Sequence, residues 1–83
     1  MNSAVIELDL HGLSLDEARD AIDDALRHCD MSVYRVRLIH GFNNGTARRD
    51  MIFREYRYHM KVMRVVGGQN RVQTDLVLRE YYG

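Results

Sequence analysis

The first half of the chain carries a strand pattern, a helix pattern and a second strand pattern in succession, and this order constrains the fold most. Residues 6–11 alternate between apolar side chains and acidic or histidine side chains, the period of a strand with one buried face. Ser14 and Glu17 then form a Ser-x-x-Glu capping box, which predicts that a helix starts here. Apolar residues recur at spacings of three and four up to Cys29, and residues 33–39 alternate again. This order predicts a βαβ unit with two parallel strands and a right-handed crossover.

The second half adds a helix and two strands. The sequence predicts a helix over 47–59 with Met51 and Met60 on its apolar side, and strands over 62–66 and 74–82. Strands and helices therefore alternate along the chain as in an α/β protein. The predicted fold is an α+β two-layer sandwich, βαβαββ, with a four-stranded mixed sheet. Both helices are expected on one face, with Met63 also in the core, because the outward strand residues are polar. These residues are Glu7, Asp9, Arg35, Arg37, Arg64, Asp75 and Arg79.

A chain of 83 residues has room for a single domain, which we expect over 1–83. Its one cysteine cannot form an internal disulfide, and no Cys/His spacing indicates structural zinc. No apolar run is long enough to span a membrane, and no targeting signal is visible. These features favour a cytoplasmic location.

The formal net charge is zero, but the charges are divided along the chain. Residues 1–30 hold eight acids and two bases, whereas nine of the ten bases in the remainder are arginine. The planar guanidinium fork suits phosphate, so this division favours a nucleic-acid partner. The alternative is a pair of solvated faces of opposite sign that neutralise each other.

Two histidines end the two predicted parallel strands, and each is followed by a glycine. His11-Gly12 and His40-Gly41 are expected at the carboxyl edge of the sheet, where α/β domains bind ligands. Two imidazoles can act as general base and general acid in phosphodiester cleavage, with Asp9 orienting or charging one of them. The alternatives are ordinary surface histidines, and an Asp9 that only bridges to Arg35 or Arg37.

Arginines are expected beside these histidines. Thr46 is a reasonable N-cap for the second helix, which places Arg48 and Arg49 in its first turn. Cations are unfavourable at the positive end of a helix dipole, so two arginines there indicate that an anion is bound.

Together these motifs resemble the Smr (small MutS-related) domain family. The likeness lies in Leu-Asp-Leu-His-Gly at 8–12, Ile-His-Gly at 39–41 with Gly45 downstream, and Gly-Gly at 67–68 before the last strand. It covers nearly the whole chain and implies a fold like the C-terminal domain of a bacterial translation initiation factor. The family is associated with DNA and RNA binding and, in several members, with endonuclease activity. The chain departs from the family at Asn43, where a second glycine is usual, and at Phe42, where lysine is frequent.

The resemblance predicts a standalone Smr-like domain whose primary activity is nucleic-acid binding, to RNA or DNA. The expected binding residues are Gly12, Gly41, Asn43, Gly45, Arg48, Arg49, Gly67 and Gly68. Weak endonuclease activity is the secondary prediction, with His11 and His40 as acid and base, Asp9 as their partner and no cofactor. RNA is the easier substrate because its 2′-OH supplies a nucleophile. The alternatives are a divalent metal held by Asp9 and a histidine, and a noncatalytic RNA- or protein-binding module.

Overall fold

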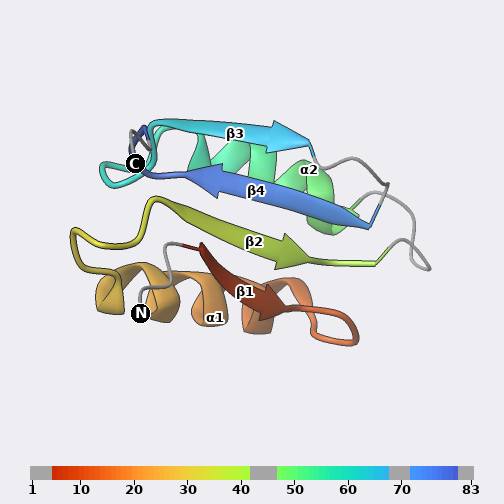
Figure 1. Cartoon of the computed structure of the whole chain (residues 1–83). Coiled ribbons are helices and arrows are strands. Elements are labelled where there is room, and N and C mark those ends of the chain that lie inside the picture. Colours follow the sequence, from red (N-terminus) through yellow and green to blue (C-terminus); the bar gives the residue numbers. More distant parts are fainter. Residues whose placement is uncertain (1–4, 42–46, 68–71, 81–83) are drawn as a thin grey trace.

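The computed structural model describes residues 5–41, 47–67 and 72–80, which form one sheet with two helices packed on it (Figure 1). In chain order the elements are β1 (Val5–Asp9), α1 (Leu15–His28), β2 (Arg35–Ile39), α2 (Ala47–Tyr56), β3 (Arg64–Gly67) and β4 (Gln73–Val77). The predicted βαβαββ order is confirmed.

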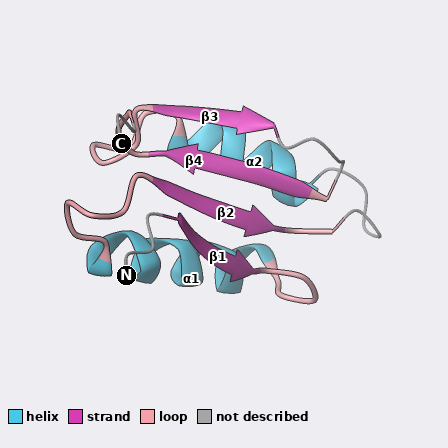
Figure 2. Cartoon of the chain, in the orientation of Figure 1, coloured by secondary structure: helices cyan, strands magenta, loops and turns pink. Residues whose placement is uncertain are grey.

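The sheet has the strand order β1-β2-β4-β3. β1 and β2 are parallel, with Val5 opposite Arg35, whereas β4 runs antiparallel to both β2 and β3. The sheet is therefore mixed, as predicted. Both helices lie behind the sheet in Figure 2, so that no described element covers its other face.

The core lies between the helices and the inward side chains of the strands. Every second residue of β2 is buried, and Val36 and Leu38 are paired with Leu76 and Thr74 of β4. The core is completed mainly by Leu10, Ala18, Ile22, Leu26, Val33, Met51, Ile52, Tyr56, Val62 and Leu78. Paired residues of a sheet share a face, so Thr74 points toward the helices.

The predicted capping box starts α1. Glu17 N donates to Ser14 Oγ at 3.1 Å, and Ser14 N donates to Glu17 Oε1 at 2.9 Å. α1 and α2 are joined by an ion pair in which Arg19 Nε and Nη2 donate to the two Glu55 oxygens at 2.7 and 2.9 Å. The Glu55 hydrogen bond raises the pKa of Arg19, and the same hydrogen bond lowers the pKa of Glu55.

Four elements are shorter than the sequence predicted, and among them β2 starts at Arg35 rather than at 33. α2 ends at Tyr56 rather than at 59, and single-turn bonds follow it, from His59 N to Tyr56 O and from Val62 N to His59 O. Met60 therefore lies beyond the end of α2 and not on the buried face of that helix. It is 94% exposed, and Met63 is 45% exposed. The prediction that both fill the core is wrong. β3 starts at Arg64, and β4 ends at Val77, opposite Arg35 and Arg64, the first residues of its antiparallel neighbours β2 and β3.

The uncovered face of the sheet carries a buried carboxylate. Asp75 is opposite Arg37 and is 3% exposed. Arg35 Nη1 donates to Asp75 Oδ2 at 2.6 Å, and Arg37 Nε lies 3.5 Å from Asp75 Oδ1. The two arginines of β2 are therefore held by β4 rather than by β1.

Candidate nucleic-acid interface

The parallel strands β1 and β2 end at the same edge of the sheet, on the right in Figure 2. The chain continues from β1 through residues 10–14 into α1, and α2 begins near the same edge. Leu10 N donates to Ile39 O at 2.7 Å, so the two strands remain paired as they reach this edge. The edge presents residues that the sequence separates by more than thirty positions.

Asp9 and His11 form a pair at the end of β1. Asp9 Oδ1 accepts a hydrogen bond from His11 N at 3.0 Å and lies 3.8 Å from His11 Nδ1. The two side chains are 68% and 72% exposed, so a phosphate can approach the imidazole from solvent. The carboxylate holds the turn and lies beside the imidazole.

The two glycines of this edge are required by the backbone. Gly12 has φ +83° and Gly41 has φ +70°, a left-handed conformation that side chains other than glycine disfavour. A Cβ at either position would meet no atom within 4 Å. The glycines therefore set the exits from β1 and β2, and they leave open space beside the backbone.

His40 differs from His11 in its surroundings. It is 3% exposed, with Nδ1 2.7 Å from Gly41 O and Nε2 2.8 Å from Thr74 Oγ1. A carbonyl oxygen only accepts, so Nδ1 carries a hydrogen, while Nε2 is hydrogen-bonded to the Thr74 hydroxyl. His40 N and Gly41 N also donate to Val72 O, at 2.8 and 3.2 Å. The end of β2 is thus fastened to β4 through side chain and backbone.

Arg48 joins α2 to the loop that follows β1. Its Nε donates to Leu13 O at 2.9 Å, and its Nη2 donates to the same oxygen. Arg49, the next residue, is 48% exposed; its guanidinium carbon lies 5.0 Å from the centre of the Phe53 ring. Arg48 is therefore largely committed to the protein, whereas Arg49 presents a more open cation.

The structure brings Asp9 and His11 together, and it brings Arg48 to the loop after them. Within the described ranges no hydrogen bond or ion pair joins the imidazoles of His11 and His40. Nor, within those ranges, does an ion pair join Asp9 to either arginine of β2. Gly67 is the last residue of β3, whereas Asn43, Gly45 and Gly68 lie outside the described residues.

Two features of this edge were missed from the sequence. Thr74, the partner of His40, had a signal: period-two alternation places it at a core position between strand neighbours, and a buried hydroxyl needs a partner. The acceptor for Arg48 is the backbone carbonyl of Leu13, which no side-chain pattern reveals.

The described part of the chain holds neither a metal-binding cluster nor a membrane-spanning helix. No three His, Cys, Asp or Glu side chains gather there into a group that would hold a metal ion. No helix among the same residues has the length and apolar character needed to cross a membrane.

Comparison with known proteins identifies the family of this two-layer domain. The sequence model of the Smr domain matches residues 8–80, and the chain therefore belongs to the Smr domain family. The crystal structure of the Smr domain of Thermus thermophilus MutS2 superimposes with a TM-score of 0.78 and 29% sequence identity. The match covers 90% of this chain and 99% of that one. No match was found among curated proteins. Smr domains are nucleic-acid-binding, nuclease-like modules.

Proposed function

We propose that this Smr domain binds nucleic acid at the carboxyl edge of β1 and β2, and that Asp9 and His11 give it a weak endonuclease activity. The observation that carries the proposal is the contact of Arg48 with Leu13 O, which joins the first turn of α2 to the loop bearing His11. Strand ends, positive-φ turns and a helix N-terminus then form one continuous edge, the arrangement at which α/β domains bind phosphate groups.

Arg49 supplies the electrostatic part of binding. It lies in the first turn of α2, is half exposed and has its nearest described carboxylate, Asp50 Oδ1, 3.9 Å away. With about four phosphate contacts, a plot of the logarithm of the binding constant against the logarithm of the salt concentration has a slope of about −3 to −4. Losing one arginine contact reduces the size of that slope by about 1.

His11 supplies the chemical part. Its exposed imidazole takes a proton from the attacking 2′-OH of RNA or gives one to the leaving oxygen, while Asp9, 3.8 Å from His11 Nδ1, orients the ring. His40 was also expected to take part in acid–base chemistry. Its two ring nitrogens are already bonded, which supports a positioning role in which His40 holds the end of β2.

The test uses end-labelled single-stranded RNA and duplex DNA, with and without chelator. We expect His11→Ala to lower RNA cleavage by about 10²- to 10⁴-fold, while the salt slope of binding stays unchanged. His28→Ala is the matched control, since His28 is equally exposed but lies in the last turn of α1 at the other end of the strands. Loss of cleavage with chelator would instead support a metal held by Asp9 and a histidine.

The binding arm uses Arg49→Ala with Arg27→Ala as its control, because Arg27 is an exposed helical arginine in the last turn of α1. The first is expected to weaken binding and lower the salt slope, and the second to do neither. Binding without cleavage in the unmodified domain would leave a noncatalytic RNA-binding module. If neither nucleic acid binds, the noncatalytic protein-binding alternative replaces this proposal.

A further inference from the structure

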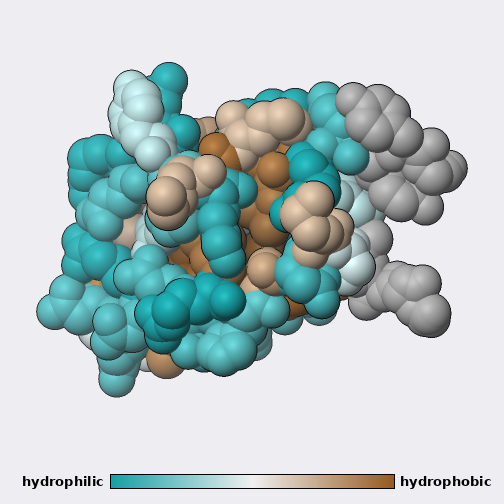
Figure 3. Space-filling view, turned by 90° about the vertical axis from the view of Figure 1, so that its left-hand side faces the viewer, coloured by the Kyte–Doolittle hydropathy of each residue, from teal (hydrophilic) through white to brown (hydrophobic). Residues whose placement is uncertain are grey.

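The opposite end of the sheet carries an apolar groove that the proposed function does not use. It has a volume of about 550 Å³ and is lined by Met31, Met60, Lys61, Val62, Met63, Leu78, Arg79 and Glu80. Figure 3, which faces this end of the molecule, shows a hydrophobic hollow surrounded by hydrophilic residues. The lining comes from three separate segments: the α1–β2 turn, the α2–β3 turn and the chain just after β4.

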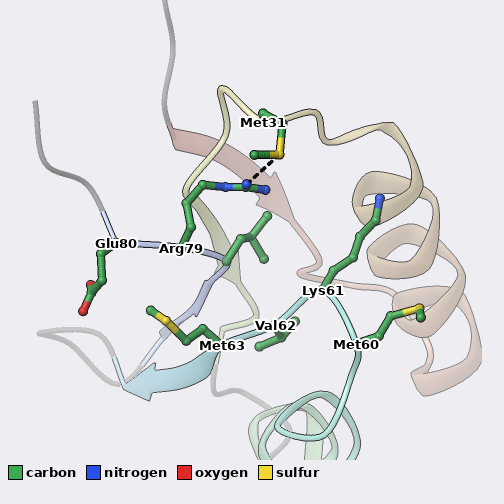
Figure 4. Close-up of a pocket in the computed structure, with 8 residues that line it drawn as sticks. Met31, Met60, Lys61, Val62, Met63, Arg79 and Glu80 are labelled. Atoms are coloured by element: carbon green, nitrogen blue, oxygen red, sulfur yellow. Dashed lines mark hydrogen bonds between the residues drawn. The ribbon is translucent and has the colours of Figure 1, made fainter.

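The groove has a buried floor and exposed methionine walls. Val62 and Leu78 are 7% and 8% exposed and belong to the core, so the floor is fixed. Met31 and Met60 are 79% and 94% exposed, and Figure 4 shows them on different sides of the groove. Flexible thioether side chains adapt to varied apolar partners, and they recur at surfaces that bind amphipathic segments.

Four backbone amides around the groove are already hydrogen-bonded, which bears on the form of a partner. Val62 N donates to His59 O and Met63 N to Val77 O, while Leu78 N and Arg79 N both donate to the carbonyl of residue 34. These amides cannot also pair with an incoming strand. A partner that satisfies its own backbone and contributes only side chains fits this surface, and a helix does so.

The rim of the groove is positively charged. Arg64 Nη2 lies 3.2 Å from Glu80 Oε1, which neutralises the one carboxylate among the lining residues. Lys61 Nζ donates to Leu26 O at 2.6 Å, and Arg79 donates to Val33 O at 3.1 Å and to Met31 Sδ at 3.0 Å. These acceptors carry no formal charge, and no ion pair of either cation with a carboxylate is found in the described residues.

The nearby Asp30 does not make the net charge of the rim negative. Its carboxylate Oδ1 accepts from Ser32 N and Oγ at 2.8 and 2.5 Å, and these hydrogen bonds, with a smaller contribution from Arg79, lower its pKa. Counting Asp30, Lys61, Arg79 and the Arg64–Glu80 pair, the rim retains a net positive charge.

We infer that this groove, named here the methionine groove after Met31, Met60 and Met63, binds an amphipathic helix of a partner protein whose apolar stripe is flanked by carboxylates. The apolar stripe packs on Val62 and Leu78 between the methionines, and the carboxylates lie against Lys61 and Arg79. The inference does not depend on the proposed nucleic-acid activity, because the two surfaces lie at opposite ends of the strands.

The experiment observes the methionine methyl groups by NMR in the whole chain labelled at methionine Cε. The core Met51 is fully buried and serves as an internal reference, while Met31, Met60 and Met63 report on the groove. The probes are three synthetic peptides of about 16 residues with the same leucine stripe and with Glu, Gln or Lys at the flanking positions. We expect saturable shifts of the three groove methyls with the Glu peptide, no shift of Met51, and binding of the Lys peptide at least about fivefold weaker.

Variants locate the contact. The double change Met31→Gln and Met60→Gln alters only exposed side chains and is expected to weaken the Glu peptide about tenfold. Arg79→Gln is expected to weaken the Glu peptide about threefold and to leave the Gln peptide unchanged. Tyr58→Ser is the matched control, because Tyr58 is 81% exposed and does not line the groove.

Three results would overturn the inference. The first is no shift with any peptide at about 1 mM, which corresponds to about 4 kcal/mol of binding free energy. The second is equal binding of the Lys and Glu peptides. The third is a dependence of the groove methyl shifts on protein concentration without peptide, which would make a second copy of this chain the occupant.

Discussion

The two ends of the sheet are built by different forces. The edge at the carboxyl ends of β1 and β2 is held by hydrogen bonds, with His40 fastened to Thr74 and Arg48 to Leu13 O. The methionine groove at the other end rests on Val62 and Leu78, which are core residues, and its walls are exposed thioethers. A hydrogen-bonded edge fixes the direction of each group, as phosphate recognition requires, whereas an apolar groove walled by unbranched methionine side chains tolerates variation in its partner.

The largest expected effect is at His40. His40→Ala leaves a cavity and an unpaired Thr74 hydroxyl, and it should lower the free energy of unfolding by about 2–4 kcal/mol. In a domain of this size that is a fall in melting temperature of about 10 °C or more by calorimetry. Thr74→Val, which keeps the volume and removes the hydroxyl, should cost about 1–3 kcal/mol.

His40→Gln separates a positioning role from a catalytic one. Glutamine has a carbonyl to accept from Thr74 and an amide to donate to the Gly41 carbonyl. If His40 only positions the strand end, this variant keeps nucleic-acid binding and RNA cleavage within about threefold while His11→Ala loses cleavage. A folded His40→Gln domain that binds RNA but does not cleave it would return His40 to the acid–base pair.

Gly41→Ala should have the next largest effect. The methyl group meets no neighbouring atom, so the cost is the left-handed backbone alone, about 1–2 kcal/mol in urea unfolding. Gly41→Asn should recover part of it, because asparagine tolerates this conformation. The matched change at the other end, Met60→Gln, is expected to stay within about 0.5 kcal/mol, since that side chain is almost fully exposed. A Gly41→Ala domain as stable as the unmodified one would contradict this backbone argument.

The carboxyl edge was largely predictable from the sequence, because its position follows from order. Alternation at 6–10 and 33–39 with a capped helix between them gives parallel strands, and parallel strands bring His11 and His40 to one edge. The exposure of each histidine was not predictable in the same way. His40 continues the inward phase of Val36 and Leu38, yet its burial also depends on Thr74, which pairs with Leu38 from more than thirty residues away.

The methionine groove was not predicted. The apolar stripe on 47–59 includes Met60 if the helix continues, and only the tertiary packing shows that α2 ends at Tyr56. Tyr56 OH donates to Asp23 Oδ1 at 2.7 Å. Burial raises the pKa of Tyr56, and this hydrogen bond adds a smaller contribution in the same direction. This contact fixes the last turn of α2 against α1, after which the chain turns and Met60 is left exposed. Helix ends of this kind are set by long-range contacts that local propensity does not encode.

The ion pair between Arg19 and Glu55 should stabilise the whole fold at neutral pH and lose this contribution in acid. The hydrogen bond from Arg19 lowers the pKa of Glu55 below its ordinary value of 4.5. The pair therefore stabilises the fold above that pH, and its contribution is lost as the pH falls below it toward the lowered pKa. Glu55→Gln is expected to flatten the fall in urea midpoint between about pH 5 and pH 3, with an effect smaller than those of His40 and Gly41. An unchanged acid slope would show that Arg19 contributes nothing to the linkage.

The smallest expected effect is the change in RNA affinity at the carboxyl edge when a peptide occupies the methionine groove. β2 alone spans about 13 Å from Arg35 to Ile39 at 3.3 Å per residue, and the screening length is about 8 Å at physiological salt. Charge on a bound RNA is therefore screened from Lys61 and Arg79, and no loop is shared between the edge and the groove. We expect saturation with the Glu peptide to change the RNA dissociation constant, measured by fluorescence anisotropy, by less than about twofold. A tenfold change would contradict this expectation, because it would require two conformations of the sheet whose populations both ligands shift. The affinity for the peptide would then change by the same tenfold factor when RNA is bound.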